Sequence, residues 1–186
     1  MRPIIPLLPL ALIVAACGGP AETTPVATSD FDVKLTPVVT EAEWPWGLAF
    51  LPGGGMLVTE RTGDLRLIRD GALAEEPVSG VPEVLALSQG GLLDIALPPD
   101  FETSSLVYLS FASGTAQSNN TALYRARYED GALLDGGVIW TSQMNKTGGA
   151  HFGGRIAFMD DGTLLLTLGD GFEFREEAQN LENHFG

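Results

Sequence analysis

The chain has 186 residues, 45% of them apolar, with one Cys and two His. This length fits one domain with a short tail, and the apolar content suffices for a sizeable core. A net charge of −14 argues strongly against nucleic acid as a partner, because phosphate binding needs clustered Lys and Arg. A single Cys excludes an internal disulfide framework and any zinc site built on several thiolates.

Residues 1–16 are predicted to be a signal peptide. Arg2 precedes an apolar stretch, Ile4 to Ala16, which is shorter than the roughly 20 residues that a spanning helix needs. It ends VAACG at residues 14–18, which resembles the lipobox of bacterial lipoproteins. In that family the Cys is diacylated and becomes the mature N-terminus. The resemblance implies a lipid on Cys17, although an ordinary signal peptide with an incidental Cys is also open.

The segment after Cys17 is expected to be a flexible linker. Residues 17–30 are mostly Pro, Thr, Ala and Gly, with few large apolar groups. The acidic body would be repelled by anionic headgroups, so membrane attachment would depend on the lipid. We therefore expect a protein of the bacterial cell envelope that is lipid-anchored and faces the periplasm.

From residue 31 onward the pattern predicts an all-β domain with internal repeats. Short apolar strands begin near Leu48, Ile95 and Ile156, and each is followed by a turn and a second strand. Further strands are expected at residues 65–69, near 77–78, at 122–128 and at 138–141, and a short helix only within 173–183. A propeller blade has four strands in about 40 to 50 residues, so residues 31–186 predict part of a β-propeller.

The repeats supply two four-stranded units and the start of a third. Propellers close a ring of roughly four to eight blades. We therefore expect this chain to be the N-terminal part of a longer protein.

His151 is the strongest candidate for acid–base chemistry. It lies in GGAHFGGR, residues 148–155, at the entry to the first strand of the third repeat, where flanking glycines leave the ring accessible. An imidazole with a pKa near neutral can act as a general base. Asp170 ends the strand that follows, and an antiparallel hairpin would return it to His151 to orient the ring. A loop His bonded only to backbone, and a turn-forming Asp, are the structural alternatives.

Two other features at strand entries are candidates for binding. Gln89 precedes the second repeat at the blade end where His151 precedes the third, and its amide suits a polar ligand. Trp44 and Trp46 flank Pro45 before the first repeat, where core packing is favoured over stacking on a sugar ring. Glu60 and Arg61 are expected to form a local ion pair.

Together these segments resemble the soluble quinoprotein sugar dehydrogenases, the glucose/sorbosone and aldose sugar dehydrogenase family. The matching segments are WGLAFLP at 46–52, MLVTERTG at 56–63, QGGLLDIAL at 89–97, PDF at 99–101, HFGGRI at 151–156, LGD at 168–170 and AQNL at 178–181. They occur in order over most of the chain. Ala150 stands where some glucose-specific relatives have Asp, which is closer to the broad-specificity aldose branch.

The resemblance implies a six-bladed β-propeller, of which this chain holds about the first two and a half blades. It implies pyrroloquinoline quinone (PQQ) and Ca²⁺ as cofactors, and oxidation of the C1 hydroxyl of aldoses to lactones. His151 would be the base, Asp170 its orienting carboxylate and Gln89 a contact to PQQ or substrate. The family's Ca²⁺ ligands and cationic contacts to PQQ lie in later blades, beyond residue 186, so we expect this chain alone to be inactive.

Two alternatives stay open at this level. One is a calcium-dependent propeller lactonase, although such an enzyme would want carboxylate ligands where this chain has His and Gln. The other is a lipid-anchored propeller that binds a partner and has no catalytic activity.

Overall fold

The computed structural model describes residues 24–27, 32–143 and 145–185, and these form two units. The unit that ends at Pro37 contains one antiparallel pair, β1 (Thr24–Ala27) and β2 (Asp32–Leu35). Part of the expected linker is therefore a strand. The predicted signal peptide and Cys17 lie outside the described residues, so these predictions stay untested.

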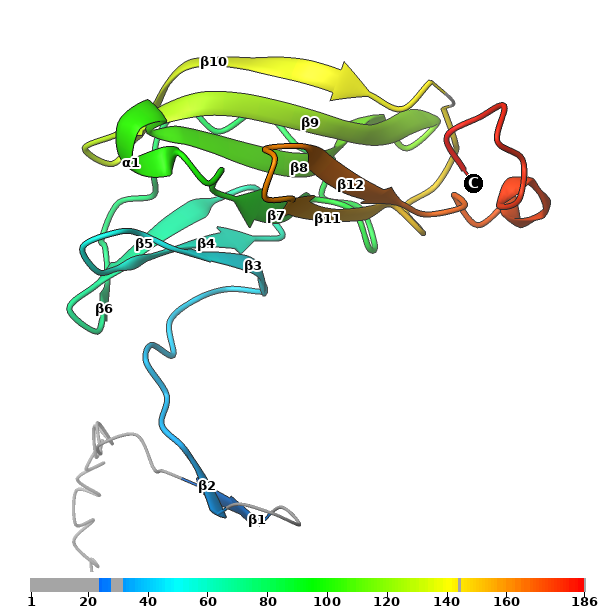
Figure 1. Ribbon diagram of the computed structural model, residues 1–186. Coiled ribbons are helices and arrows are strands. Elements are labelled where there is room, and N and C mark those ends of the chain that lie inside the picture. Colours follow the sequence, from blue (N-terminus) through cyan, green and yellow to red (C-terminus); the bar gives the residue numbers. More distant parts are fainter. Residues whose placement is uncertain (1–23, 28–31, 144, 186) are drawn as a thin grey trace, which may run out of the picture. The chain divides into compact units, whose positions relative to one another are not determined.

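The second unit, from Val38 onward, is built from three antiparallel sheets (Figure 1). The first has the strand order β3-β4-β5-β6, the second β10-β9-β8-β7, and the third β11-β12. Their bounds are β3 (Pro45–Phe50), β4 (Met56–Glu60), β5 (Leu65–Arg69), β6 (Ala72–Leu73), β7 (Leu92–Ala96), β8 (Leu106–Thr115), β9 (Ser118–Glu129), β10 (Ala132–Thr141), β11 (Gly153–Phe158) and β12 (Leu164–Leu168).

The sheets confirm the all-β prediction and the division into two four-stranded units and the start of a third. Two details differ. The fourth strand of the first sheet is β6, not the segment near Pro77, and Val78 donates its N–H to Leu65 O at 2.8 Å without forming a strand. The expected C-terminal helix is only a 3₁₀ turn, η1 (Arg175–Glu177), and a short α-helix, α1 (Phe101–Ser104), follows Pro99. Among the described residues no helix is long and apolar enough to span a membrane.

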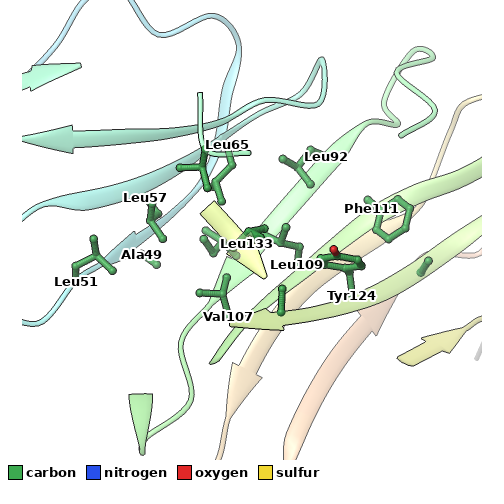
Figure 2. Packing of buried hydrophobic residues seen from close by; sticks show 14 residues of the cluster. Ala49, Leu51, Leu57, Leu65, Leu92, Val107, Leu109, Phe111, Tyr124 and Leu133 are labelled. Carbon is green, nitrogen blue, oxygen red and sulfur yellow. The ribbon is translucent and has the colours of Figure 1, made fainter. Parts of the chain in front are cut away.

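The core lies on the two faces of β7, which packs between β3 and β11 (Figure 1). Leu92 and Ile95 join the larger cluster with the first sheet and with β8 and β9, part of which Figure 2 shows. Leu93 faces the other way, toward Phe152. Burying each such side chain contributes about 1.5–3 kcal/mol, so β7 fixes the positions of its neighbours.

Hydroxyl groups at equivalent positions in the second strands link one sheet to the next. Thr59 Oγ1 accepts the Gly47 N–H at 2.8 Å and donates to Leu93 O at 2.7 Å. Ser110 repeats this one sheet later, accepting the Asp94 N–H at 3.0 Å and donating to Gly154 O. Both side chains are fully buried, so we call them hydroxyl latches. Thr167 holds the same position in β12, where its oxygen accepts the Arg155 N–H at 2.9 Å.

Asp94 adds an ionic link between the second and third sheets. Its buried carboxylate accepts hydrogen bonds from the Arg155 guanidinium and the Ile156 N–H, both at 2.8 Å. Both oxygens are therefore bonded to β11. The latches and this pair hold the start of β11 against β7, and that start carries the functional candidates.

Candidate active site

The hairpin β11–β12 brings His151 and Asp170 together, as expected. His151 precedes β11 and Asp170 follows β12, so the antiparallel pairing returns the carboxylate to the entry of the first strand. His151 Nδ1 lies 2.6 Å from Asp170 Oδ1. The third candidate is also there, because Gln89 Oε1 accepts the His151 N–H at 2.9 Å. All three residues lie at one end of the sheets, although their functional roles stay predictions.

The contact with Asp170 fixes which nitrogen of His151 can act as a base. The hydrogen bond from His151, with a second from the Phe172 N–H, holds the pKa of Asp170 below its usual range. The ionised carboxylate has no proton to donate, so His151 Nδ1 must carry the hydrogen of the pair. In the neutral ring, Nε2 then has the free lone pair. The imidazole is 41% exposed, which leaves it open to a substrate.

The backbone of His151 is held as firmly as its ring. It has a left-handed conformation with φ of 54°, uncommon for a residue with a side chain. The Gly171 N–H donates to its carbonyl oxygen at 3.3 Å. A Cβ atom at residue 169 would lie 2.3 Å from that same oxygen, so only glycine fits there. Strained conformations of this kind cluster at functional sites.

Phe172 supports the imidazole from the side, which sequence reasoning did not foresee. Its ring meets the His151 ring edge-on at a centroid distance of 5.3 Å and an angle of 84°. The Phe172 N–H also bonds the Asp170 carboxylate at 2.8 Å. Phe172 therefore contacts both His151 and Asp170. Nothing in the local sequence indicates this role.

Lys146 is buried near His151, and sequence reasoning missed it as well. Its ammonium nitrogen is 3.4 Å from the centre of the Phe152 ring, and its side chain packs on Gly171. Among the described residues, this nitrogen has no hydrogen-bond partner. Removal from water lowers the pKa of Lys146 to about 8, although the charge of Glu173 opposes the shift. Lys146 and His151 both line a cavity of about 10 Å³, room for about one water molecule.

Two expectations for the first sheet were wrong. Trp44 and Trp46 are 69% and 46% exposed, so neither is packed in the core of the described structure. Glu60 pairs with Arg66 at 3.6 Å and not with Arg61, whose guanidinium donates to Ser88 O at 2.9 Å. The cause is strand alternation: successive side chains point to opposite faces, so Glu60 and Arg61 diverge.

Carboxylate and imidazole side chains do not gather into a metal site within the described ranges. These residues contain no group of three or more His, Cys, Asp or Glu that could hold a metal ion. The expectation of Ca²⁺ therefore stays a prediction.

Comparison with known proteins points to one family. A family model described as glucose/sorbosone dehydrogenase matches residues 42–186. Aldose sugar dehydrogenase YliI of Escherichia coli K12 is 40% identical over 154 residues, which cover 81% of this chain and 41% of that protein. An uncharacterised Synechocystis protein is 39% identical over an alignment of 202 positions, gaps included, that covers 96% of this chain and 49% of that protein.

A solved structure is similar over most of the chain. The PQQ-bound form of an aldose sugar dehydrogenase from Streptomyces coelicolor has a TM-score of 0.68 and 29% identity, covering 90% of this chain and 47% of its own. The chain thus spans less than half the length of each of these three proteins.

Proposed function

This chain belongs to the glucose/sorbosone dehydrogenase family, and from that premise we propose that it serves in the PQQ-dependent oxidation of aldoses. The reaction would take the C1 hydroxyl of the sugar to the lactone. The aldose is the expected substrate, and the electron acceptor that reoxidises the cofactor is left unassigned.

The observation that carries the proposal is the exposed imidazole of His151 bonded through Nδ1 to Asp170. Oxidation at C1 requires that the hydroxyl lose its proton while the carbon loses a hydride. We propose that His151 Nε2 takes the hydroxyl proton. Asp170 would hold the ring in the correct tautomer and stabilise the imidazolium that forms, as carboxylates do in related acid–base pairs.

PQQ would supply the redox chemistry by accepting the hydride, and the described residues fit this group in part. Gln89 and His151 offer an amide and a base at one end of the sheets, which suits a polar quinone. The carboxylates of PQQ need cations, but the Lys146 side chain is buried against the Phe152 ring and is not open to solvent. We expect most ligands of these carboxylates and of Ca²⁺ to correspond to the segments of the relatives that this chain does not span.

We propose that the sheets β3–β6 and β7–β10 are complete blades of a six-bladed propeller and that β11–β12 begins a third. Support comes from the way the sheets repeat. Each has its first strand beside that of the next, and the same hydroxyl latch joins successive pairs.

The test is His151→Ala with His184→Asn as its matched control. His184 Nδ1 accepts the Gln143 N–H at 3.0 Å, and Asn keeps an acceptor oxygen there. Aldose-dependent dye reduction would be measured, with PQQ and Ca²⁺ added, in a full-length protein that contains this chain, because the chain alone is expected to be inactive. The proposal expects His151→Ala to lose about 10²–10⁴ in kcat and the control to retain activity. Equal activity in both variants would refute the base role, and sugar binding without turnover in any form would favour a non-catalytic binding protein.

We also propose that Cys17 carries a lipid and that the protein is anchored in the cell envelope, facing the periplasm. The VAACG segment is the support. Expression in a bacterium with labelled palmitate tests it: the label should appear in the wild type and be absent from Cys17→Ser. Incorporation of equal label in both would refute the anchor.

A further inference from the structure

Residues 88–91, which we call the Gln89 loop, contact all three sheets. The loop leads into β7 of the second sheet. Gly91 packs on the first sheet, because a Cβ atom at this residue would lie 1.9 Å from Arg61 O. Gly90 packs on the third sheet, because a Cβ atom there would lie 2.8 Å from Cε2 of the Phe152 ring. The position of the loop therefore depends on residues of both neighbouring sheets.

The Gln89 loop carries a direct contact to the candidate base. Gln89 Oε1 accepts the His151 N–H at 2.9 Å, and the Gln89 N–H donates to Gly149 O at 2.8 Å. The backbone that presents Gln89 is strained, because Ser88 before it has a left-handed conformation with φ of 54°. A strained loop keeps its shape only where the surrounding structure holds it.

Arg61, which directly follows β4, holds the loop through its side chain and its backbone. Nη1 of its guanidinium donates to Ser88 O at 2.9 Å and more weakly to Gly90 O at 3.5 Å. Its carbonyl oxygen accepts the Leu92 N–H at 3.1 Å. The planar guanidinium has five N–H donors in a fixed geometry, so it suits two neighbouring carbonyls better than a flexible ammonium group does.

The donors of Arg61 are free for the loop, because Arg61 forms no ion pair among the described residues. Its guanidinium carbon instead lies 5.8 Å from the centre of the Trp44 ring. Arg66, in the same sheet, has a different role. It pairs with the buried Glu60 at 3.6 Å and donates to Ala74 O at 2.8 Å. Arg66 therefore offers a matched control.

We propose that Arg61 is a positioning residue, which holds the Gln89 loop so that Gln89 stays bonded to the backbone of His151. Arg61 acts through Gln89 and not by contact with the substrate. The bond to the His151 N–H supports the left-handed backbone conformation of His151 and so the direction of the imidazole. The benefit to catalysis rests on the proposed aldose oxidation, whereas the contact between Arg61 and the loop stands without it.

The first experiment measures how often the loop opens in a full-length protein that contains this chain. Deuterium uptake of residues 88–92 is followed by mass spectrometry in wild type, Arg61→Met, Arg61→Lys and the control Arg66→Met. A hydrogen bond from a charged group corresponds to a factor of about 10–100 in such an equilibrium. We expect uptake to be faster by about that factor in Arg61→Met and by less in Arg61→Lys. Arg66→Met should match wild type.

The second experiment separates positioning from a general loss of stability. The kcat of aldose oxidation is measured, with PQQ and Ca²⁺ added, in wild type, Arg61→Met, Gln89→Leu and the double variant. Because Arg61 acts through Gln89, its replacement should lower kcat about tenfold in wild type and by less than about twofold in Gln89→Leu. Arg66→Met should leave kcat unchanged. If Arg61→Met does not fold, Arg61→Lys carries both comparisons.

Equal uptake in wild type and Arg61→Met would overturn the proposal, as would an equal loss of kcat with and without the Gln89 side chain. The two proposals fail separately. Faster uptake in Arg61→Met, without aldose oxidation by any form, would uphold the positioning of the loop and refute the proposed function. Oxidation by wild type, with unchanged uptake in Arg61→Met, would do the reverse.

Discussion

Asp170 Oδ1 lies 2.6 Å from His151 Nδ1 and, at 2.8 Å, also accepts the Phe172 N–H. A single carboxylate oxygen therefore fixes both the ring and the loop that packs against its edge. A neutral Asn at residue 170 can turn its NH₂ group toward the ring and donate to Nδ1. Replacing Asp170 by Asn therefore removes the negative charge and also allows the His151 tautomer whose proton is on Nε2.

Asp170→Asn should lower kcat of aldose oxidation by about 10²–10⁴ while the fold is kept, since the ring would lose its oriented Nδ1–H donor. Steady-state dye reduction by a full-length protein that contains this chain, with PQQ and Ca²⁺ added, measures this, and circular dichroism checks the fold. A loss of less than threefold would show that the carboxylate does not position the base. Asp161→Asn, on the turn between β11 and β12, is the matched control and should keep full activity.

Acid should remove the stabilisation that Asp170 provides. Its pKa is lowered in the folded state, chiefly by the hydrogen bond from His151, so its contribution is complete above the ordinary value of about 3.9. It is lost as pH falls below that value through the folded pKa. The urea midpoints of wild type and Asp170→Asn should therefore differ by a constant amount above pH 5 and converge below about pH 4. A constant difference down to pH 2 would contradict this.

Ser110→Ala should destabilise the protein by about 1–3 kcal/mol, because the Asp94 N–H and Gly154 O would be buried without partners. Urea unfolding with an unchanged slope measures the loss. Ser110→Thr is the conservative variant for comparison, because it keeps the hydroxyl group. Ser118→Ala, at an exposed position in β9, should change the free energy of unfolding by less than about 0.5 kcal/mol. Equal midpoints for the two alanine variants would show that the latch contributes nothing.

Lys146→Met should stabilise the protein at pH 7 by about 1 kcal/mol. The buried ammonium without a partner costs about 1–3 kcal/mol, and its contact with Phe152 returns about 0.5–2 kcal/mol. With the folded pKa lowered from 10.5 to about 8, the unfolded state binds more protons between these values, so wild-type stability should rise with pH there. In Lys146→Met this rise should be absent.

Lys34 is exposed, so Lys34→Met serves as the control for this experiment. Its stability should still rise with pH above about pH 8, as in the wild type. Unfolding by urea at pH 7, 8, 9 and 10 measures it. A lower midpoint for Lys146→Met at pH 7 would show that its cation–π contact outweighs the cost of burial.

Local pattern predicted the hairpins and the pairing of His151 with Asp170, because two strands joined by a short turn must return to one end. Gln89 followed from the same argument applied to the neighbouring repeat. These inferences needed only strand direction and the alignment of repeats, which the sequence carries.

Burial and long-range contacts could not be predicted in this way. Trp46, Leu48 and Phe50 lie on one face of β3 and are all exposed, because that face has no covering layer in the described structure. The partner of Asp94 is Arg155, 61 positions further along the chain, and the burial of Lys146 depends on Phe152 and Gly171. Such contacts depend on how sheets stack, and composition gives no sign of them.

The hydroxyl latches have an evolutionary consequence. Each repeat has a Ser or Thr oxygen that accepts an amide N–H from the first strand of its own sheet. In the first two repeats the hydroxyl also donates to a backbone carbonyl of the next repeat, whatever side chain that residue bears. Tandem duplication of the underlying gene segment would thus create a working joint immediately, before any adaptive change at the new boundary. Divergence could then change the residue whose amide is bound, as Gly47, Asp94 and Arg155 illustrate, provided that one small hydroxyl is kept in every copy.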